Sequence, residues 1–235
     1  MKLLSFGEIV WDIYEDEQCL GGAPLNFASY AALFGEKVWL MSAVGNDKLG
    51  EKAIELIKNW GINTEYISII SAKETGKCIV KLNDNSVPTY NVLQDVAYDY
   101  MQIPQMKEEF DIIAFGTMAL RSDNNKQILS QIIKSQNFSE IFVDVNIRPP
   151  FYSNDTILFC LRNASILKIS EEEMHYIAEA ISQKYNSAEN FALHLCKMFK
   201  QIKLIIITKG ENGAICYNRD EKKCYSCAAS GALAW

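Results

Sequence analysis

Short apolar runs alternate along the chain with longer amphipathic stretches. Apolar runs of about four to eight residues indicate strands, and apolar positions three and four residues apart indicate helices. The pattern predicts the main strands at Leu3–Val10, Val38–Val44, Glu65–Ile70, Asp111–Phe115, Ile141–Val145, Ile166–Ile169 and Leu204–Ile207. It predicts helices at Pro24–Phe34, Asp47–Trp60, Asp123–Ser135, Asp155–Asn163, Glu171–Ala180 and Ala188–Lys200. Strands that alternate with helices predict an α/β fold with a mainly parallel sheet.

Two predicted hairpins interrupt this alternation. Cys78–Leu82 and Val87–Leu93 flank the polar turn Asn83-Asp84-Asn85-Ser86, which predicts an antiparallel hairpin inserted among the βα units. This insertion is a candidate lid, and the alternative is a decoration of the sheet edge. A closing hairpin is predicted from Ala214–Tyr217 and Lys223–Cys227. No repeat or linker separates these segments, so we expect one domain over residues 1–235 with a small insertion.

Polar residues follow the first predicted strand and precede the first predicted helix. Asp12 comes just beyond a strand end, where open α/β sheets bind their ligands, and its carboxylate can accept hydrogen bonds from two hydroxyl groups. Gly21 and Gly22 allow a ligand to approach the backbone in front of a helix N-terminus. Asn26 offers both a donor and an acceptor. The alternative is a tight turn with a solvated carboxylate.

A second group of polar residues ends the strand Ile141–Val145. Asp144, Asn146 and Arg148 alternate along a segment that Pro149 should keep extended, so their side chains are expected to project in the same direction. An arginine held there can bind a phosphate or a carboxylate through two hydrogen bonds. The alternative is a structural ion pair between Asp144 and Arg148.

The run Leu204–Ile207 has four apolar residues in succession, which predicts a central strand buried on both faces.

Two further segments carry candidate chemistry. Ser170 is a predicted helix N-cap, and the acidic residues up to Glu173 follow it in the first turn, where the helix dipole favours them. Capping alone accounts for this run, and a carboxylate associated with Mg²⁺ is the alternative. The turn Thr208–Ala214 contains glycines that could lie against a nucleotide or simply connect a strand to a hairpin. His175 and His194 are expected on helix surfaces without a catalytic role.

Composition and charge exclude several classes of function. The 235 residues carry a net charge of −6, and the 23 lysines and arginines are scattered, whereas nucleic-acid binding needs clustered basic residues. No apolar run approaches the roughly 18 residues that cross a membrane. The opening segment lacks the cleavage site of a signal peptide, so the seven cysteines are expected to stay reduced in the cytoplasm. Neither a P-loop nor a G-x-G-x-x-G sequence is present.

Taken together and in chain order, these motifs resemble the ribokinase-like (PfkB) family of carbohydrate kinases and, within it, the fructokinase branch. The segments that carry the resemblance are Gly7-Glu8-x-x-x-Asp12, Gly21-Gly22-Ala-Pro-Leu-Asn26, Gly45-x-Asp47-x-x-Gly50, Thr75-Gly76 to Asp95, Phe110–Gly116, Asp144-x-Asn146-x-Arg148-Pro149, Lys168-x-Ser170-x-x-Glu173 and Thr208-x-Gly210-x-x-Gly213. The resemblance implies a three-layer α/β/α domain with a mainly parallel sheet. It also implies a β-lid built from residues 75–100 and 12–20, with the C-terminal part of the domain missing.

The resemblance further implies a reaction and its residues. A sugar hydroxyl would attack the γ-phosphate of ATP, with Mg²⁺ as the metal ion. The sugar-binding residues would be Asp12, Gly21, Gly22, Asn26, Gln94, Asn146 and Arg148. The nucleotide-binding residues would be Lys168, Ser170, Thr208, Gly210 and Gly213. Glu173 would act indirectly on the metal ion.

The family's proton-accepting aspartate belongs to a Gly-Ala-Gly-Asp motif, and this chain has only Gly231-Ala232 near its end. We therefore expect a truncated and inactive chain without a catalytic residue. Gln94 stands where fructokinases often have an arginine, and Arg148 leaves 2-keto-3-deoxygluconate open as a substrate. A non-catalytic sugar-binding remnant is a further alternative. The expected partners are a small sugar and ATP, with a homodimer formed through the lid, and neither nucleic acid nor a membrane.

Overall fold

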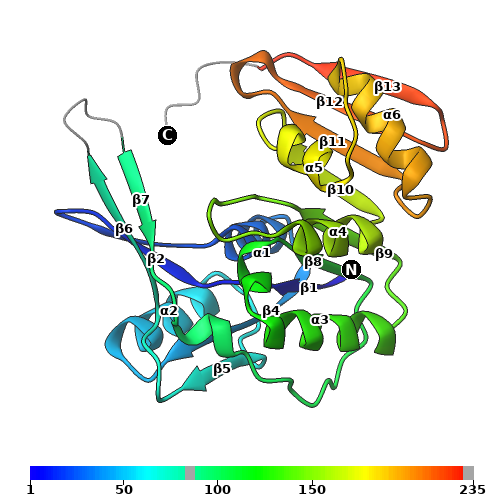
Figure 1. Cartoon of the computed structure of the whole chain (residues 1–235). Helices are drawn as coiled ribbons and strands as arrows, with labels where there is room; N and C mark the ends of the chain where they lie inside the picture. Colours follow the sequence, from blue (N-terminus) through cyan, green and yellow to red (C-terminus); the bar gives the residue numbers. More distant parts are fainter. Residues whose placement is uncertain (83–87, 230–235) are drawn as a thin grey trace. The chain divides into compact units, whose positions relative to one another are not determined.

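The computed structural model describes residues 1–82 and 88–229, which belong to two compact units, Met1–Ser139 and Glu140–Trp235 (Figure 1). Each unit contains strands and helices. The predicted turn Asn83-Asp84-Asn85-Ser86 and the pair Gly231-Ala232 lie outside the described residues.

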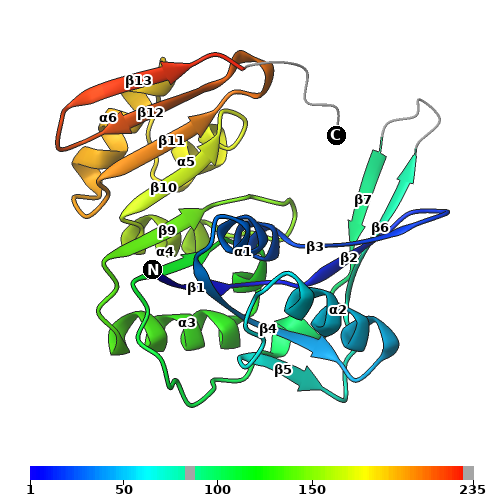
Figure 2. The same ribbon diagram turned by 180° about the vertical axis from the view of Figure 1, so that it is seen from behind.

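The main sheet of the first unit is parallel and runs in the order β8-β1-β4-β5. Its strands are Ile112–Phe115 (β8), Lys2–Phe6 (β1), Lys37–Gly45 (β4) and Ile67–Ile70 (β5). Helices cover both faces, with α1 and α2 on one side and α3 on the other (Figures 1 and 2). These helices are Ala23–Leu33 (α1), Lys48–Asn59 (α2) and Asp123–Ser135 (α3).

The core under α1 and α2 explains why these segments fold as they do. Val38, Leu40 and Val44 point from β4 to the same side, because alternate side chains of a strand share a face. Leu25 of α1 and Ile57 of α2 pack into this apolar layer and are fully buried. The helix periodicity and the strand periodicity in the sequence therefore describe the two sides of one core.

A second, smaller sheet of four strands runs in the order β3-β2-β6-β7 and is called the small sheet below. Its strands are Val10–Ile13 (β2), Gln18–Gly21 (β3), Gly76–Leu82 (β6) and Pro88–Val92 (β7). β2 and β6 are parallel, and the other two pairs are antiparallel. The hairpin predicted around residues 78–93 is confirmed as β6 and β7, which project from the unit in Figure 1.

The predicted strand Leu3–Val10 was wrong in one respect, because it contains parts of two strands. β1 ends at Phe6, and Val10 begins β2 of the small sheet. The chain turns at Gly7, where an added Cβ would lie 2.2 Å from Cγ of Pro24. Ile9 and Trp11 remain buried beyond this turn, so hydrophobicity alone gave no sign that the chain changes sheets.

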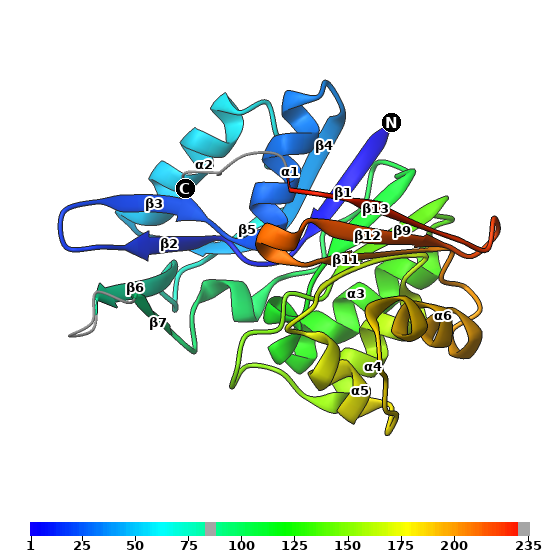
Figure 3. The ribbon, with the colours of Figure 1, turned by 90° about the horizontal axis from the view of Figure 1, so that it is seen from above.

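The sheet of the second unit runs in the order β13-β12-β11-β10-β9. Its first three strands in the chain are parallel, and the last two form the predicted closing hairpin. The strands are Glu140–Asp144 (β9), Ile166–Ser170 (β10), Leu204–Thr208 (β11), Ala214–Asn218 (β12) and Lys223–Cys227 (β13). Three helices, Asn154–Asn163 (α4), Met174–Ala180 (α5) and Ala188–Met198 (α6), lie on one side of it (Figure 3).

Two expectations for the second unit were wrong. Ile205 and Ile207 are buried, whereas Leu204 and Ile206 are only half-buried, so β11 is buried on one face rather than on both. The reason is that the unit's three helices gather on one side of its sheet (Figure 3). The helix predicted from Glu171 begins at Met174, after a turn.

All seven cysteines lie within the described residues and are free thiols in the structure. Among the described helices none has the length and apolar character needed to cross a membrane.

Candidate functional site

The carboxylate predicted to bind sugar lies in the small sheet. Asp12 is part of β2, opposite Cys19 of β3 and Cys78 of β6, and not beyond the end of a main-sheet strand as the sequence pattern predicted. Residues opposite each other in neighbouring strands share a face of the sheet, so Asp12 and Cys78 lie on one face. The small sheet therefore holds this carboxylate on a hydrogen-bonded strand rather than on a loop.

The glycine pair lies directly beside Asp12. Gly21 ends β3, and an added Cβ there would lie 3.3 Å from Oδ2 of Asp12, so the glycine leaves the flank of the carboxylate open. Gly22 is the N-cap residue of α1 with φ of 119°, and its backbone carbonyl accepts a hydrogen bond from the amide of Asn26 at 2.8 Å. Asn26 is exposed in the first turn of α1. The structure thus brings three predicted sugar-side elements to one end of α1.

Gln94 is placed separately from this group. It is exposed and follows β7, which is two strands away from β2 in the small sheet. Its neighbour Leu93 is fixed at both backbone groups, because its amide donates to the carbonyl of Lys77 at 2.9 Å and its carbonyl accepts from Nη2 of Arg121 at 2.9 Å. The backbone next to Gln94 is therefore well defined.

A pocket of about 570 Å³ in the second unit gathers many of the other predicted residues. It is lined by Asn146, Ile147, Arg148, Pro149, Lys168, Ser170, Glu172, Glu173, His175 and Tyr176. The sequence analysis did not name His175 and Tyr176 as lining residues; His175 is exposed on α5, as predicted, and still lines the pocket. Tyr176 comes three residues after Glu173, a spacing that puts two helical side chains on one face, so this spacing could have indicated Tyr176; no such spacing indicates His175.

The predicted extended segment from Asp144 to Arg148 is not continuous. β9 ends at Asp144, and Asn146 adopts a positive φ of 44°. Asp144 forms an ion pair with Lys168, the residue opposite it on β10, rather than with Arg148. The distance from Nζ of Lys168 to Oδ1 of Asp144 is 3.0 Å. Burial raises the pKa of Asp144, and the positive charges of Lys168 and Arg148 reduce this shift. Asn146 and Arg148 still line one pocket, although backbone curvature and not strand alternation brings them together.

Glu173 is buried and accepts two backbone hydrogen bonds. Its Oε1 accepts from the amide of Ile147 at 2.5 Å, and its Oε2 accepts from the amide of Ser170 at 2.7 Å. Oγ of Ser170 in turn accepts from the amide of Glu173 at 3.2 Å, which is the reciprocal pattern of a capping box. Glu173 therefore ties the segment after β9 to the end of β10. Its indirect role at a metal ion stays a prediction.

The residues present do not form a dedicated metal site. Both carboxylate oxygens of Glu173 are already hydrogen-bonded, and no group of three or more His, Cys, Asp or Glu side chains within residues 1–82 and 88–229 could hold a metal ion. Mg²⁺ commonly keeps several waters and is bound through nucleotide phosphates with one or two carboxylates.

Of the remaining predicted nucleotide-side residues, Thr208 lies beside this pocket, and Gly210 and Gly213 follow it along the chain. Thr208 is the partner of Ser170 across β10 and β11, so both residues stand at the carboxyl ends of parallel strands. The following turn is closed by a hydrogen bond from the amide of Lys209 to the carbonyl of Gly213 at 2.8 Å. Gly210 and Gly213 have positive φ values of 56° and 85°. Ligands of open α/β sheets bind at such strand ends.

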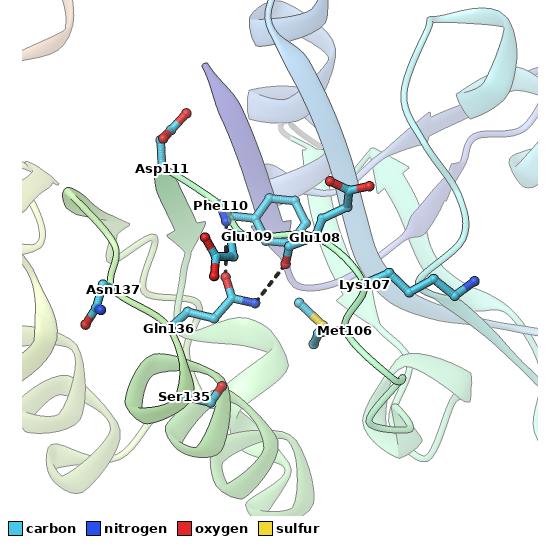
Figure 4. A pocket seen from close by; sticks show the side chains of 9 residues that line it. All are labelled: Met106, Lys107, Glu108, Glu109, Phe110, Asp111, Ser135, Gln136 and Asn137. Carbon is cyan, nitrogen blue, oxygen red and sulfur yellow. Dashed lines mark hydrogen bonds between the residues drawn. The ribbon is translucent and has the colours of Figure 1, made fainter.

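A second pocket, of about 540 Å³, lies in the first unit and contains no predicted site residue (Figure 4). It lies at the amino end of β8, whereas ligands bind at the carboxyl ends of strands. Gln136 crosses it, accepting from the amide of Phe110 and donating to the carbonyl of Glu108, both at 3.1 Å. The side-chain amide of Gln136 therefore fixes the backbone beside this pocket.

Residues 3–231 match the model of one protein family, described as pfkB family carbohydrate kinase. The chain belongs to this family. It is thus a member of a family of phosphotransferases whose acceptor is a sugar.

Individual relatives agree with this assignment. The sugar kinase PH1459 of Pyrococcus horikoshii is 32% identical over 177 residues, which cover 71% of this chain and 57% of the relative. The fructokinase of Salmonella typhimurium is 22% identical over 229 residues, covering 91% of this chain and 73% of the relative. The chain thus spans somewhat more than half the length of the first relative.

Solved structures confirm the predicted ribokinase-like α/β fold. PH1459 in complex with ATP matches with a TM-score of 0.80 and 26% identity, covering 98% of this chain and 78% of that one. A fructokinase from Vibrio cholerae, solved in a fructose, ADP and calcium ion bound form, matches with a TM-score of 0.81 and 21% identity over 98% of this chain and 77% of that one. At such low identity the second match supports the fold alone.

Proposed function

We propose that the chain binds a sugar and ATP for the phosphorylation of a sugar hydroxyl, and that fructose is the sugar to test first. The observation that carries this proposal is the position of Asp12, whose carboxylate lies beside Gly21 at the start of α1. A carboxylate can accept hydrogen bonds from two neighbouring sugar hydroxyls. Asn26 adds a donor and an acceptor, and the absence of a side chain at Gly21 leaves room for the sugar beside Asp12.

The proposed nucleotide site is formed by residues of the second unit. Ser170 and Thr208 stand at adjacent strand ends, and the turn with Gly210 and Gly213 offers backbone groups without obstructing side chains. Lys168 would supply positive charge toward the phosphates, although it already pairs with Asp144. ATP would bring Mg²⁺ with it, which neutralises phosphate charge during the transfer.

Arg148 supports a second candidate substrate class, the 2-keto-3-deoxy sugar acids. Its guanidinium lines the same pocket as Asn146 and Lys168 and can bind a carboxylate through two hydrogen bonds. Gln94, which is neutral, gives no added preference for fructose. A sugar acid would therefore use Arg148 as the residue that distinguishes it from fructose.

We further propose that these 235 residues bind ligands without rapid phosphoryl transfer, because they contain no Gly-Ala-Gly-Asp sequence. A positioned base contributes about 10²–10⁴-fold to the rate, and the backbone donors of an anion hole add a comparable factor. An assay that couples ADP release to absorbance tests this, and fast turnover would contradict it. The lid role of the small sheet, the dimer and the cytoplasmic location stay predictions.

Titration calorimetry with fructose and with 2-keto-3-deoxygluconate tests the proposed sugar site. We expect Asp12→Asn to weaken sugar binding by about 10- to 100-fold, because a hydrogen bond to a charged group contributes about 1.5–3 kcal/mol. Arg148→Gln is the matched control: it should weaken binding of the sugar acid and leave fructose binding unchanged. If neither ligand releases heat with the unaltered chain, the proposed function is wrong.

A further inference from the structure

The small sheet that carries Asp12 is joined to the rest of its unit by side-chain anchors at both ends of the β6–β7 hairpin. The first anchor holds Thr75, the residue before β6, and the second holds Leu93, the residue after β7. Neither anchor belongs to the sugar-side residues described above. Their contacts explain how the strand next to Asp12 is held in place.

The first anchor is a network around Asp47. Oδ2 of Asp47 accepts a hydrogen bond from the amide of Thr75 at 2.8 Å, and Oδ1 accepts from the Thr75 hydroxyl at 2.7 Å. Oδ1 also accepts from the amide of Gly50 at 2.8 Å, so one carboxylate caps α2 and fixes the start of β6. The hydroxyl oxygen of Thr75 accepts from the amide of Gly45, at the end of β4, at 2.9 Å. Thr75 is fully buried within this network.

The second anchor is an ion pair between Arg121 and Asp99. Nε and Nη2 of Arg121 donate to the two carboxylate oxygens of Asp99 at 2.8 and 2.9 Å, and Nη2 also donates to the carbonyl of Leu93 at 2.9 Å. Both side chains are nearly buried, with 11% and 12% of their surface exposed. The guanidinium also lies over the ring of Tyr98, 4.8 Å from its centre. The backbone that leaves β7 is thereby fixed to the segment Met118–Arg121.

The first anchor transmits its position to Asp12 through the strand ladder. Thr75 is followed at once by Gly76, which pairs with Val10, and Cys78 then pairs with Asp12. An added Cβ at Gly76 would lie 2.6 Å from the carbonyl oxygen of Ile9 and 2.8 Å from the ring of Tyr98, so β6 lies directly against the β1–β2 connection. A shift of Thr75 therefore moves the neighbour of Asp12.

We propose that Thr75, with Asp47, and Arg121 are positioning residues that set the sugar affinity by fixing the small sheet relative to α1. The proposal rests on the proposed sugar site at Asp12 and Asn26. These two residues sit on different elements, β2 and α1, so a sugar that contacts both requires a fixed distance between them. The groups of a binding site must be held within about 0.5 Å of their productive positions.

Calorimetry with fructose at 20 °C, together with thermal unfolding, tests this proposal on substitutions of the anchors. Thr75→Val keeps the size of the side chain but loses both hydroxyl contacts, and we expect it to weaken fructose binding about tenfold. Thr75→Ser retains the hydroxyl and should restore the affinity. Arg121→Lys keeps the charge beside Asp99 but cannot bridge to Leu93 as well, so it should also weaken binding.

A buried core substitution separates positioning from general loss of stability. Ile57→Val removes one methyl group from the core under α2, outside both anchors, and lowers the unfolding temperature. We expect it to leave fructose affinity unchanged. Wild-type affinity in both Thr75→Val and Arg121→Lys, or an equal loss in Ile57→Val, would overturn the proposal. If Thr75→Val does not fold, the fructose affinity of Arg121→Lys alone tests the proposal.

The same experiment keeps this proposal apart from the proposed function. If fructose binds the unaltered chain and Asp12→Asn abolishes binding while the anchor variants bind normally, only the positioning role fails. If no sugar binds the unaltered chain, the sugar site fails and the positioning role fails with it.

Discussion

Gly21 and Gly22 are adjacent, but the structure constrains them in different ways. An added Cβ at Gly21 would lie 3.3 Å from Oδ2 of Asp12 and 3.9 Å from the carbonyl oxygen of Val10, and the backbone there is not in a left-handed conformation. Gly22 has φ of 119°, and an added Cβ would lie 2.4 Å from the carbonyl oxygen of Glu8. The missing side chain at Gly21 therefore leaves space for the proposed ligand, whereas the missing side chain at Gly22 is required by the fold.

Alanine substitutions should separate these two effects. We expect Gly21→Ala to lower fructose affinity while leaving stability almost unchanged, because the methyl group crowds Asp12 without straining the backbone. Gly22→Ala should destabilise the chain by about 1–3 kcal/mol through its strained backbone conformation, and the close approach to Glu8 adds to this loss. Urea unfolding and calorimetry measure the two quantities. Equal stability losses in both variants would contradict this division.

At the scale of elements, the chain uses capping groups to join helices to strands. Asp47 begins α2 and also holds Thr75 ahead of β6, and Ser170 with Glu173 joins β10 to the turn before α5. The sequence predicts Ser170 as a cap and places Asp47 only at the start of a helix. The structure adds a second contact in each motif, because Asp47 also accepts from the amide of Thr75 and Glu173 also accepts from the amide of Ile147.

The cap at Asp47 predicts a pH dependence of stability. Burial by itself would raise the pKa of Asp47, but hydrogen bonds from Thr75 and Gly50 outweigh it and lower the pKa below its ordinary value. A carboxyl group whose pKa is lower in the folded state stabilises fully above its unfolded pKa and loses this contribution as pH falls through the folded pKa. We therefore expect the free energy of unfolding to fall below pH about 4.

Asp47→Asn provides the comparison for this acid transition. Asparagine still caps α2, but it cannot titrate, and its amide group faces the amide of Thr75. The difference in stability between the two proteins should be largest near neutral pH and shrink as pH falls, when followed by urea unfolding from pH 6 to pH 3. A constant difference across this range would rule out a titrating Asp47.

At the scale of the whole molecule, fructose and ATP are proposed to bind residues of different units. The proposed sugar-side elements around Asp12 and Asn26 belong to Met1–Ser139, whereas the proposed nucleotide-side residues belong to Glu140–Trp235. Binding protects the elements that hold a ligand from local opening. Each ligand should therefore leave its own pattern in the exchange of backbone amides.

Hydrogen exchange detected by mass spectrometry tests this division. We expect fructose to slow exchange in peptides covering residues 10–26, and ATP with Mg²⁺ to slow exchange in peptides covering residues 166–173 and 208–213. The pocket around Gln136 is the internal control and should be unaffected by either ligand. Protection by ATP confined to the first unit would contradict the proposed nucleotide site.

Much of the fold was predictable because its signals are local. The helices α2, α3 and α6 and the strands β4, β5 and β8 lie where hydrophobic periodicity predicted them, within a few residues. Periodicity failed at Gly7, where an apolar run continues through a change of sheets, and at Leu204–Thr208, where an apolar strand is covered on one face only. In both places the outcome depends on which other element packs against the segment, and a local sequence pattern does not contain this information.

The sequence by itself determined the family and the types of side chain in the candidate site, since motif spacing and chemical type are properties of the chain. Only the tertiary structure decided that Asp12 lies on a strand of the small sheet, that Asp144 pairs with Lys168, and that Thr75 is held by Asp47. The residues of the last two pairs are 24 and 28 positions apart in the chain. Strand register and close packing, which arise from contacts across the fold, bring such residues together.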